Sequence, residues 1–139
     1  MLSKLSKGEL QLRQEPGPKN TLGLVKFIFP NEYGIYMHDT SARWLFARER
    51  RDFSHGCIRV EKPVELAEWA LAAQPVWSRE RIEAAIAGGK TISVKVGRPI
   101  SVLIIYATAV VLKNGEVHFY KDIYGEDGDL DEEAAEQGK

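Results

Sequence analysis

The hydrophobic periodicity changes twice along the chain, and this change limits the fold more than any other feature. Residues 63–74 carry apolar side chains at helical spacing behind Pro63, and residues 79–87 form a second helical segment between Ser78 and Gly88. Short β-branched and aromatic runs lie on both sides, at residues 24–29, 33–39, 91–96 and 101–120. The pattern predicts a mainly β, α+β fold with two short helices.

Turn residues divide the β-type runs into strands. Pro30-Asn31 closes the first run, so we expect two strands around a turn with His38 at the end of the second. Asn114-Gly115 between alternating apolar runs predicts a β-hairpin over residues 100–120. A short strand is also expected at residues 9–13, and residues 40–53 fit a loop with a helical turn.

The length of 139 residues fits one domain, which we expect to occupy residues 8–124. Residues 1–7 are expected to be a disordered N-terminus. Residues 125–139 hold seven acidic residues and one lysine, and they have too few large apolar side chains to pack. A disordered acidic tail is therefore expected there. The remainder carries 18 basic and 13 acidic residues and is mildly basic.

Several functional classes are disfavoured by composition. No apolar run approaches the roughly 20 residues of a membrane span, and the first residues lack the apolar core of a secretory signal. A single cysteine excludes an internal disulfide. Several arginines lie between His38 and Arg59, and they fit either a surface that attracts an anionic polymer or a solvated loop. No nucleic-acid partner is expected.

The residues with reactive side chains gather between positions 38 and 59. A thiol attacks carbon only as its thiolate, and a free cysteine with a pKa near ~8.5 needs a basic or cationic neighbour at neutral pH. Cys57 has two candidate bases, His55 and His38. Gly56 permits a sharp turn that can aim the amides of Gly56 and Cys57 at one point, as an oxyanion hole requires. The segment favours acyl transfer through a thioester.

Other interpretations remain open from the residues alone. Cys57, His55, His38 and Asp39 are all acceptable zinc ligands, although structural zinc sites normally show paired cysteines or a close histidine pair. Cys57 could also be a small buried apolar residue. His118 lies in the predicted hairpin, far from the motif, and is given no role.

The run from His38 to Ser54-His55-Gly56-Cys57-Ile58-Arg59 resembles the signature of the L,D-transpeptidase catalytic domain (YkuD family). Residues 14–40 resemble the segment before the catalytic histidine in the large periplasmic branch of that family, and residues 117–125 resemble its final strand. The resemblance spans residues 10–125. It implies the C-terminal part of a YkuD-type β-sandwich, with the helices after the cysteine segment.

The resemblance also implies a function. Such enzymes cross-link peptidoglycan: a cysteine thiolate attacks the third residue of a tetrapeptide stem, expels D-alanine, and passes the acyl group to an amine of another stem. Neither a cofactor nor a metal is implied. The site residues carried over include Cys57 as nucleophile and His38 as base, with Asp39 orienting His38 through its carbonyl. His55, Gly56 and Cys57 would line the oxyanion hole, Ser54 and Arg59 would support the site, and Tyr36 and Trp44 are candidates for substrate contacts.

The chain also departs from the family pattern. Members of this branch carry a signal or membrane anchor, a peptidoglycan-binding module and further strands before the segment that begins at residue 16, so we expect these 139 residues to be the C-terminal part of such an enzyme. The family acts in the periplasm or cell envelope, and the missing N-terminal part of the domain is an expected partner. Two alternatives follow: an inactive, truncated domain that binds peptidoglycan or a partner, and a thiol hydrolase that releases free acid.

Overall fold

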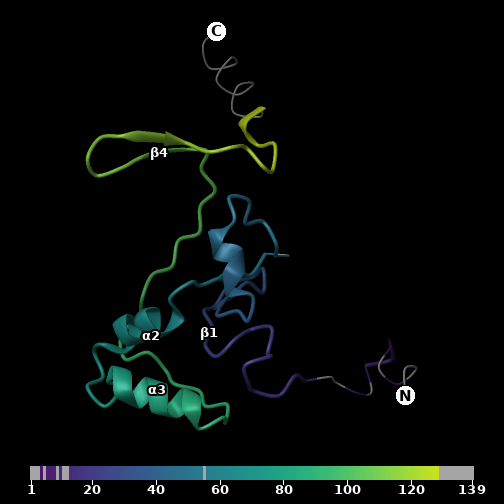
Figure 1. Cartoon of the computed structure of the whole chain (residues 1–139), viewed down its shortest axis with the longest axis vertical. Coiled ribbons are helices and arrows are strands. Elements are labelled where there is room, and N and C mark those ends of the chain that lie inside the picture. The colour runs from purple at the N-terminus through teal and green to yellow at the C-terminus, as the bar shows by residue number, and fades with distance from the viewer. Residues whose placement is uncertain (1–3, 5, 9, 11–12, 55, 129–139) are drawn as a thin grey trace. The chain divides into compact units, whose positions relative to one another are not determined.

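The computed structural model describes residues 4, 6–8, 10, 13–54 and 56–128 of the chain. The chain divides into two compact units, Met1–Ser101 and Val102–Lys139 (Figure 1). Most of the short strand expected at residues 9–13, part of the expected N-terminal segment 1–7, and residues 129–139 of the acidic tail lie outside the described residues.

A small three-stranded sheet organises the first unit. Its strands are β1 (Lys26–Phe27), β2 (Met37–His38) and β3 (Ile58–Arg59), in the order β1-β2-β3. β1 and β2 pair antiparallel, with Lys26 opposite His38, across the turn that Pro30 and Asn31 predict. The Asn31 side chain closes this turn, because its Oδ1 accepts from the amides of Tyr33 and Ile35.

β2 and β3 pair in parallel, with Met37 opposite Ile58 and His38 opposite Arg59. A parallel pair needs a long connection, and here residues 39–57 supply it. This connection contains the 3-10 helix η1 (Arg43–Ala47), which agrees with the loop and helical turn expected at residues 40–53. The parallel pairing brings two distant segments of the chain into direct contact.

Two helices follow β3, as predicted. α2 (Pro63–Leu71) begins with proline at its first position, and α3 (Arg79–Ala87) begins after Ser78, whose side chain accepts from the Arg81 amide. Gly88 caps the end of α3, and Gly89 then adopts a positive φ of 65°. Local sequence signals are sufficient to set these helix ends.

The apolar core lies between the helices and one face of the sheet. Ala67, Leu71 and Ile82 are buried, and partly buried apolar side chains from β1, from the two helices and from the loops pack against them: Val25, Phe27, Val64, Trp77, Ile86 and Val94. Successive strand residues point to opposite faces. Because Phe27 packs against the core, its neighbour Lys26 stands on the opposite face of the sheet.

The second unit contains the predicted hairpin, although in shorter form. β4 (Ala109–Val111) pairs antiparallel with β5 (Val117–Phe119) across the turn at Asn114 and Gly115. Asp122 organises the segment that follows: its Oδ1 accepts from the Tyr106 hydroxyl at 2.6 Å and the Gly125 amide at 2.8 Å, and its Oδ2 accepts from the Asp127 amide at 2.9 Å.

Two predicted strands are wrong. Residues 91–96 form no strand, and in the run 101–112 only Ala109–Val111 does. A β-type run becomes a strand only when its amides and carbonyls pair with a neighbouring strand, and in the described part of the chain no strand pairs with residues 91–96 or 101–108. Large apolar side chains are consequently exposed there, including Ile92, Leu103 and Ile105, of which Leu103 is 84% exposed.

In the described part of the chain, the helices α2 and α3 and the small β-sheets confirm the α+β class, and the strands are much shorter than the apolar runs suggested. Within the described part of the chain, no helix has the length and apolar character needed to cross a bilayer.

Acidification is predicted to loosen the Asp122 segment. The Tyr106 hydroxyl and then the backbone amides hold the pKa of Asp122 well below its usual range. A depressed folded pKa gives stability that is present above the unfolded value of about 3.9 and is lost as the pH falls toward the folded value. The NMR shift of the Gly125 amide should therefore change as the pH falls below about 4.

Asp122→Asn is the control, because the amide keeps one acceptor but removes the titration. An acid transition of the same size in Asp122→Asn would contradict this assignment.

Candidate active site

The parallel pairing of β2 and β3 brings the His38 and Cys57 segments side by side. The Ile58 amide donates to the Tyr36 carbonyl at 3.0 Å, and the Val60 amide donates to the His38 carbonyl at 2.8 Å. Continuing the register by one residue places Cys57 beside Tyr36. Backbone hydrogen bonds therefore fix the spacing of these two segments.

One face of the sheet carries the polar and reactive side chains. Residues paired in a sheet point to the same face, and every second residue along a strand does so too. From the register, this face carries Lys26, Tyr36, His38, Cys57 and Arg59. Phe27 lies on the opposite face, toward the helix core. The sheet thus separates a reactive face from a packed one.

His38 is buried, at 5% exposure, and its ring is fixed by a hydrogen bond. Nδ1 lies 2.5 Å from the carbonyl oxygen of Asp39. A carbonyl oxygen can only accept, so we assign the proton of the neutral ring to Nδ1. Nε2 then carries the lone pair and is the nitrogen available to take a proton.

Asp39 is the most deeply buried polar residue of this region, at 1% exposure, and its carboxylate is fully paired. Oδ2 accepts from the Leu24 amide at 2.9 Å, and Oδ1 forms an ion pair with Arg43 Nη2 at 2.7 Å. Arg43 also donates from Nη1 to the Glu61 carbonyl at 3.2 Å. The side chain thus ties the start of β1 to η1, while its own carbonyl holds His38.

Close packing against Asp39 requires glycine at position 23. Gly23 has a φ of +63°, and a Cβ atom there would lie 2.4 Å from Asp39 Cγ. The Asp39 carboxylate therefore fills the space that any other side chain at position 23 would need.

Tyr36 contacts both the thiol and a lysine. Its hydroxyl interacts with Cys57, and this hydrogen bond, together with burial and electrostatic repulsion from the thiolate, raises the pKa of Tyr36. Its ring lies 5.7 Å from the His38 ring between centroids, and Lys26 Nζ stands 3.5 Å from the Tyr36 centroid. Tyr36 therefore links the nucleophile candidate, the base candidate and a cation.

Gly56 turns the chain directly before Cys57. Its φ of +125° is accessible to glycine and rarely to other residues. The Gly56 amide donates to Ser54 Oγ at 3.4 Å, a long and weak hydrogen bond. Arg59 donates to the Phe53 carbonyl at 2.8 Å and so braces the turn. Cys57 is a half-buried free thiol, and His55 lies outside the described residues.

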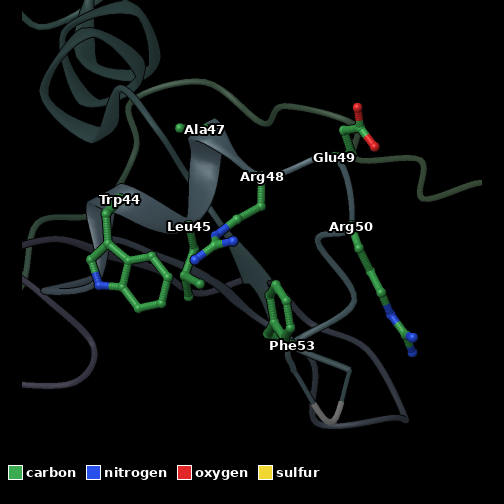
Figure 2. Close-up of a pocket in the computed structure, with 7 residues that line it drawn as sticks. All are labelled: Trp44, Leu45, Ala47, Arg48, Glu49, Arg50 and Phe53. Atoms are coloured by element: carbon green, nitrogen blue, oxygen red, sulfur yellow. The ribbon is translucent and has the colours of Figure 1, made fainter.

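The connection between β2 and β3 carries an open pocket of about 720 Å³. Figure 2 shows the seven lining residues, which include Trp44, Leu45, Arg48 and Phe53. Trp44 is 62% exposed, and the Arg48 guanidinium lies 5.5 Å from its ring centroid. Arg50 points away from Trp44 (Figure 2), and its guanidinium is paired with the Asp52 carboxylate. Trp44 therefore lines a pocket surface and is not an anchor buried in the core.

Metal ligation has no support among the residues that the structure describes, since no three His, Cys, Asp or Glu side chains form a binding group there. His118 lies on β5 in the second unit, 3.7 Å from Glu116.

Three residues in this region were not predicted from sequence. Gly23 lies in a loop, Lys26 in the short strand β1 and Arg43 at the start of the 3-10 helix η1, and none of them carries a motif of its own. The spacing of Asp39 and Arg43, four residues apart, is a signal that could have suggested an ion pair. The position of Lys26 follows only from the register of β1 and β2.

These features can be compared with known proteins. A sequence model of the L,D-transpeptidase catalytic domain (YkuD) matches residues 3–101, which include every site residue described above. The chain therefore belongs to the L,D-transpeptidase catalytic domain family.

A more specific similarity is to a Haemophilus influenzae protein named "Putative L,D-transpeptidase", with 38% identity over 117 residues. The match covers 84% of this chain and 23% of that protein. The chain thus spans about a quarter of the length of the curated relative it matches.

Substitution of Gly23 is predicted to disturb the anchoring of Asp39. Gly23→Ala should lower the free energy of unfolding by about 1–3 kcal/mol more than Gly34→Ala, because only position 23 adds overpacking to the backbone strain. Gly34 is a matched control: its φ is +65°, but a Cβ there meets nothing within 4 Å. Thermal unfolding of both variants measures the difference. Equal losses would show that Asp39 does not depend on the space at Gly23.

Proposed function

We propose that this chain is the catalytic part of an L,D-transpeptidase that forms peptidoglycan cross-links through a thioester on Cys57. The observation that carries the proposal is the parallel β2–β3 pair, which holds the Cys57 segment beside a buried His38 with its Nδ1 already engaged. Family membership supports the class of reaction.

In the first half-reaction, His38 Nε2 takes the thiol proton and the thiolate attacks the carbonyl carbon of the third residue of a tetrapeptide stem. A carbon–sulfur bond forms and the carbonyl becomes an oxyanion. When this intermediate collapses, the peptide carbon–nitrogen bond breaks. The proton on His38 passes to the leaving nitrogen, which departs as the amine of D-alanine.

In the second half-reaction, the side-chain amine of another stem attacks the thioester carbonyl. His38 takes a proton from this amine and returns it to the sulfur as the carbon–sulfur bond breaks. The products are a new amide cross-link and the free Cys57 thiol, so the enzyme is regenerated without a cofactor.

The surrounding residues have supporting roles in this proposal. Asp39 holds the His38 tautomer through its carbonyl, and the Tyr36 hydroxyl donates to the sulfur. The amides of Gly56 and Cys57, with His55, stabilise the oxyanion. Ser54 and Arg59 support the turn, and the exposed Trp44 ring contacts substrate. We place this chemistry in the cell envelope, on a catalytic domain that extends to residue 124.

A second candidate function is a non-catalytic domain that binds peptidoglycan or a partner. The exposed apolar side chains between residues 92 and 106 favour it, because exposed apolar surface is typical of a segment that binds another protein chain. The two candidates differ in whether Cys57 reacts.

Carbapenem acylation distinguishes the two candidates, since carbapenems acylate the cysteine of this family. Exposure of the purified chain should add the mass of one carbapenem on Cys57, measured by intact-mass spectrometry and peptide mapping. Cys57→Ser should show no stable adduct, and His118→Ala, in the other unit, should react like the unmodified chain. Soluble, folded chain that acquires no adduct would exclude the active enzyme.

The assignment of the base gives a separate prediction. His38→Ala should slow acylation by roughly 10²–10⁴-fold, the usual contribution of a general base, and by more than His55→Ala. The measurement is the pseudo-first-order rate of adduct formation, with folding checked by circular dichroism. If His55→Ala proved the slower variant, His55 would be the base.

A further inference from the structure

Lys26 is a cation on the reactive face of the sheet with no assigned role. It pairs with His38 across the antiparallel β1–β2 ladder, and directly opposed residues have Cβ atoms about 4.5–5.5 Å apart. Its ammonium lies 3.5 Å from the Tyr36 centroid, so the flexible side chain is held toward the ring that contacts Cys57. The charge is therefore positioned beside both proposed reacting groups.

The charge of Lys26 is not neutralised within the described part of the chain. The ion pairs there involve Arg43, Arg50, Arg79 and His118, and none involves Lys26. The nearby carboxylate of Asp39 is buried and already engaged by Arg43 and the Leu24 amide. Lys26 is exposed to solvent, so its ammonium can meet an anion that arrives with the substrate.

The geometry of the reaction indicates which anion this is. His38 delivers its proton to the leaving nitrogen, so that nitrogen must approach His38. In a C-terminal D-amino acid, one α-carbon separates this nitrogen from the carboxylate. The carboxylate is thus the substrate charge closest to His38, and Lys26 is the cross-strand neighbour of His38.

We propose that Lys26 binds the terminal carboxylate of the acyl donor and so selects stems that end in a free D-amino acid. The inference rests on the proposed function, because it takes the leaving group from that reaction. The ammonium-to-carboxylate contact forms when the donor binds and ends when the free amino acid leaves.

Binding to the Cys57→Ala chain tests the proposal without catalysis. The probes are a tetrapeptide stem that ends in D-alanine and the same peptide that ends in D-alaninamide, with Kd measured by NMR titration. The acid should bind roughly 1.5- to fivefold more tightly than the amide, the range expected of a solvent-accessible ion pair. Added salt should reduce this preference.

Variants of Lys26 locate the source of the preference. Lys26→Met keeps most of the side-chain length and should bind acid and amide equally, whereas Lys26→Arg should retain a preference for the acid. Lys113→Met, at the hairpin turn of the other unit, is the matched control and should leave the preference unchanged. Equal binding of both peptides to the parent chain, or an unchanged preference in Lys26→Met, would overturn the proposal.

The outcomes separate this inference from the proposed function. If Cys57 is acylated but Lys26→Met keeps the acid preference, the transpeptidase function stands and the role of Lys26 is wrong. If Lys26 controls the acid preference but Cys57 is never acylated, the carboxylate site stands and the catalytic function is wrong.

Discussion

The buried Asp39 carboxylate is the interaction on which the candidate site depends. A carboxylate that is buried away from water is costly unless hydrogen-bond donors replace the lost water. The Asp39 carboxylate accepts hydrogen bonds from the Leu24 amide and the Arg43 guanidinium. In the sequence, one donor precedes β2 and the other follows it: Leu24 lies before β1, and Arg43 lies in η1. Since the same residue's carbonyl holds the His38 ring, the pairing of a buried charge also fixes the tautomer of the proposed base. One residue thus both closes a buried ion pair and holds the ring of His38.

The two faces of the three-stranded sheet carry different kinds of side chain. Phe27 and Val25 pack toward the helix core, while Lys26, Tyr36 and His38 stand on the other face with Cys57. Strand alternation therefore lets very short strands serve both stability and chemistry. The helices α2 and α3 contribute the buried side chains Ala67, Leu71 and Ile82 and no residue of the site. They stabilise the first unit from behind the reactive face.

Sequence reasoning succeeded where the signals are local. Ser78, Pro63 and Gly88 mark helix ends by their own backbone and side-chain chemistry, and Asn114-Gly115 marks a hairpin. It failed at residues 91–96, because an apolar β-type run becomes a strand only with a partner, which no local pattern supplies. The histidine and cysteine of the candidate site were evident from the motif. Gly23, Lys26 and Arg43 were not, because their importance arises from contacts between segments distant in sequence.

The parallel pairing of β2 and β3 has a consequence for how such a site can diversify. Two backbone hydrogen bonds, from the Ile58 amide to Tyr36 and from the Val60 amide to His38, set the spacing of the His38 and Cys57 segments. Trp44, Arg48 and Phe53 belong instead to the connection that runs from the end of β2 to the start of β3. Between Arg43, which anchors its beginning, and the Gly56 turn at its end, this connection can be exchanged for one of different length or composition. In the proposed mechanism, the residues that contact substrate and the residues that carry the chemistry thus belong to different segments of the chain, and this connection is the part to exchange when selectivity is to be altered.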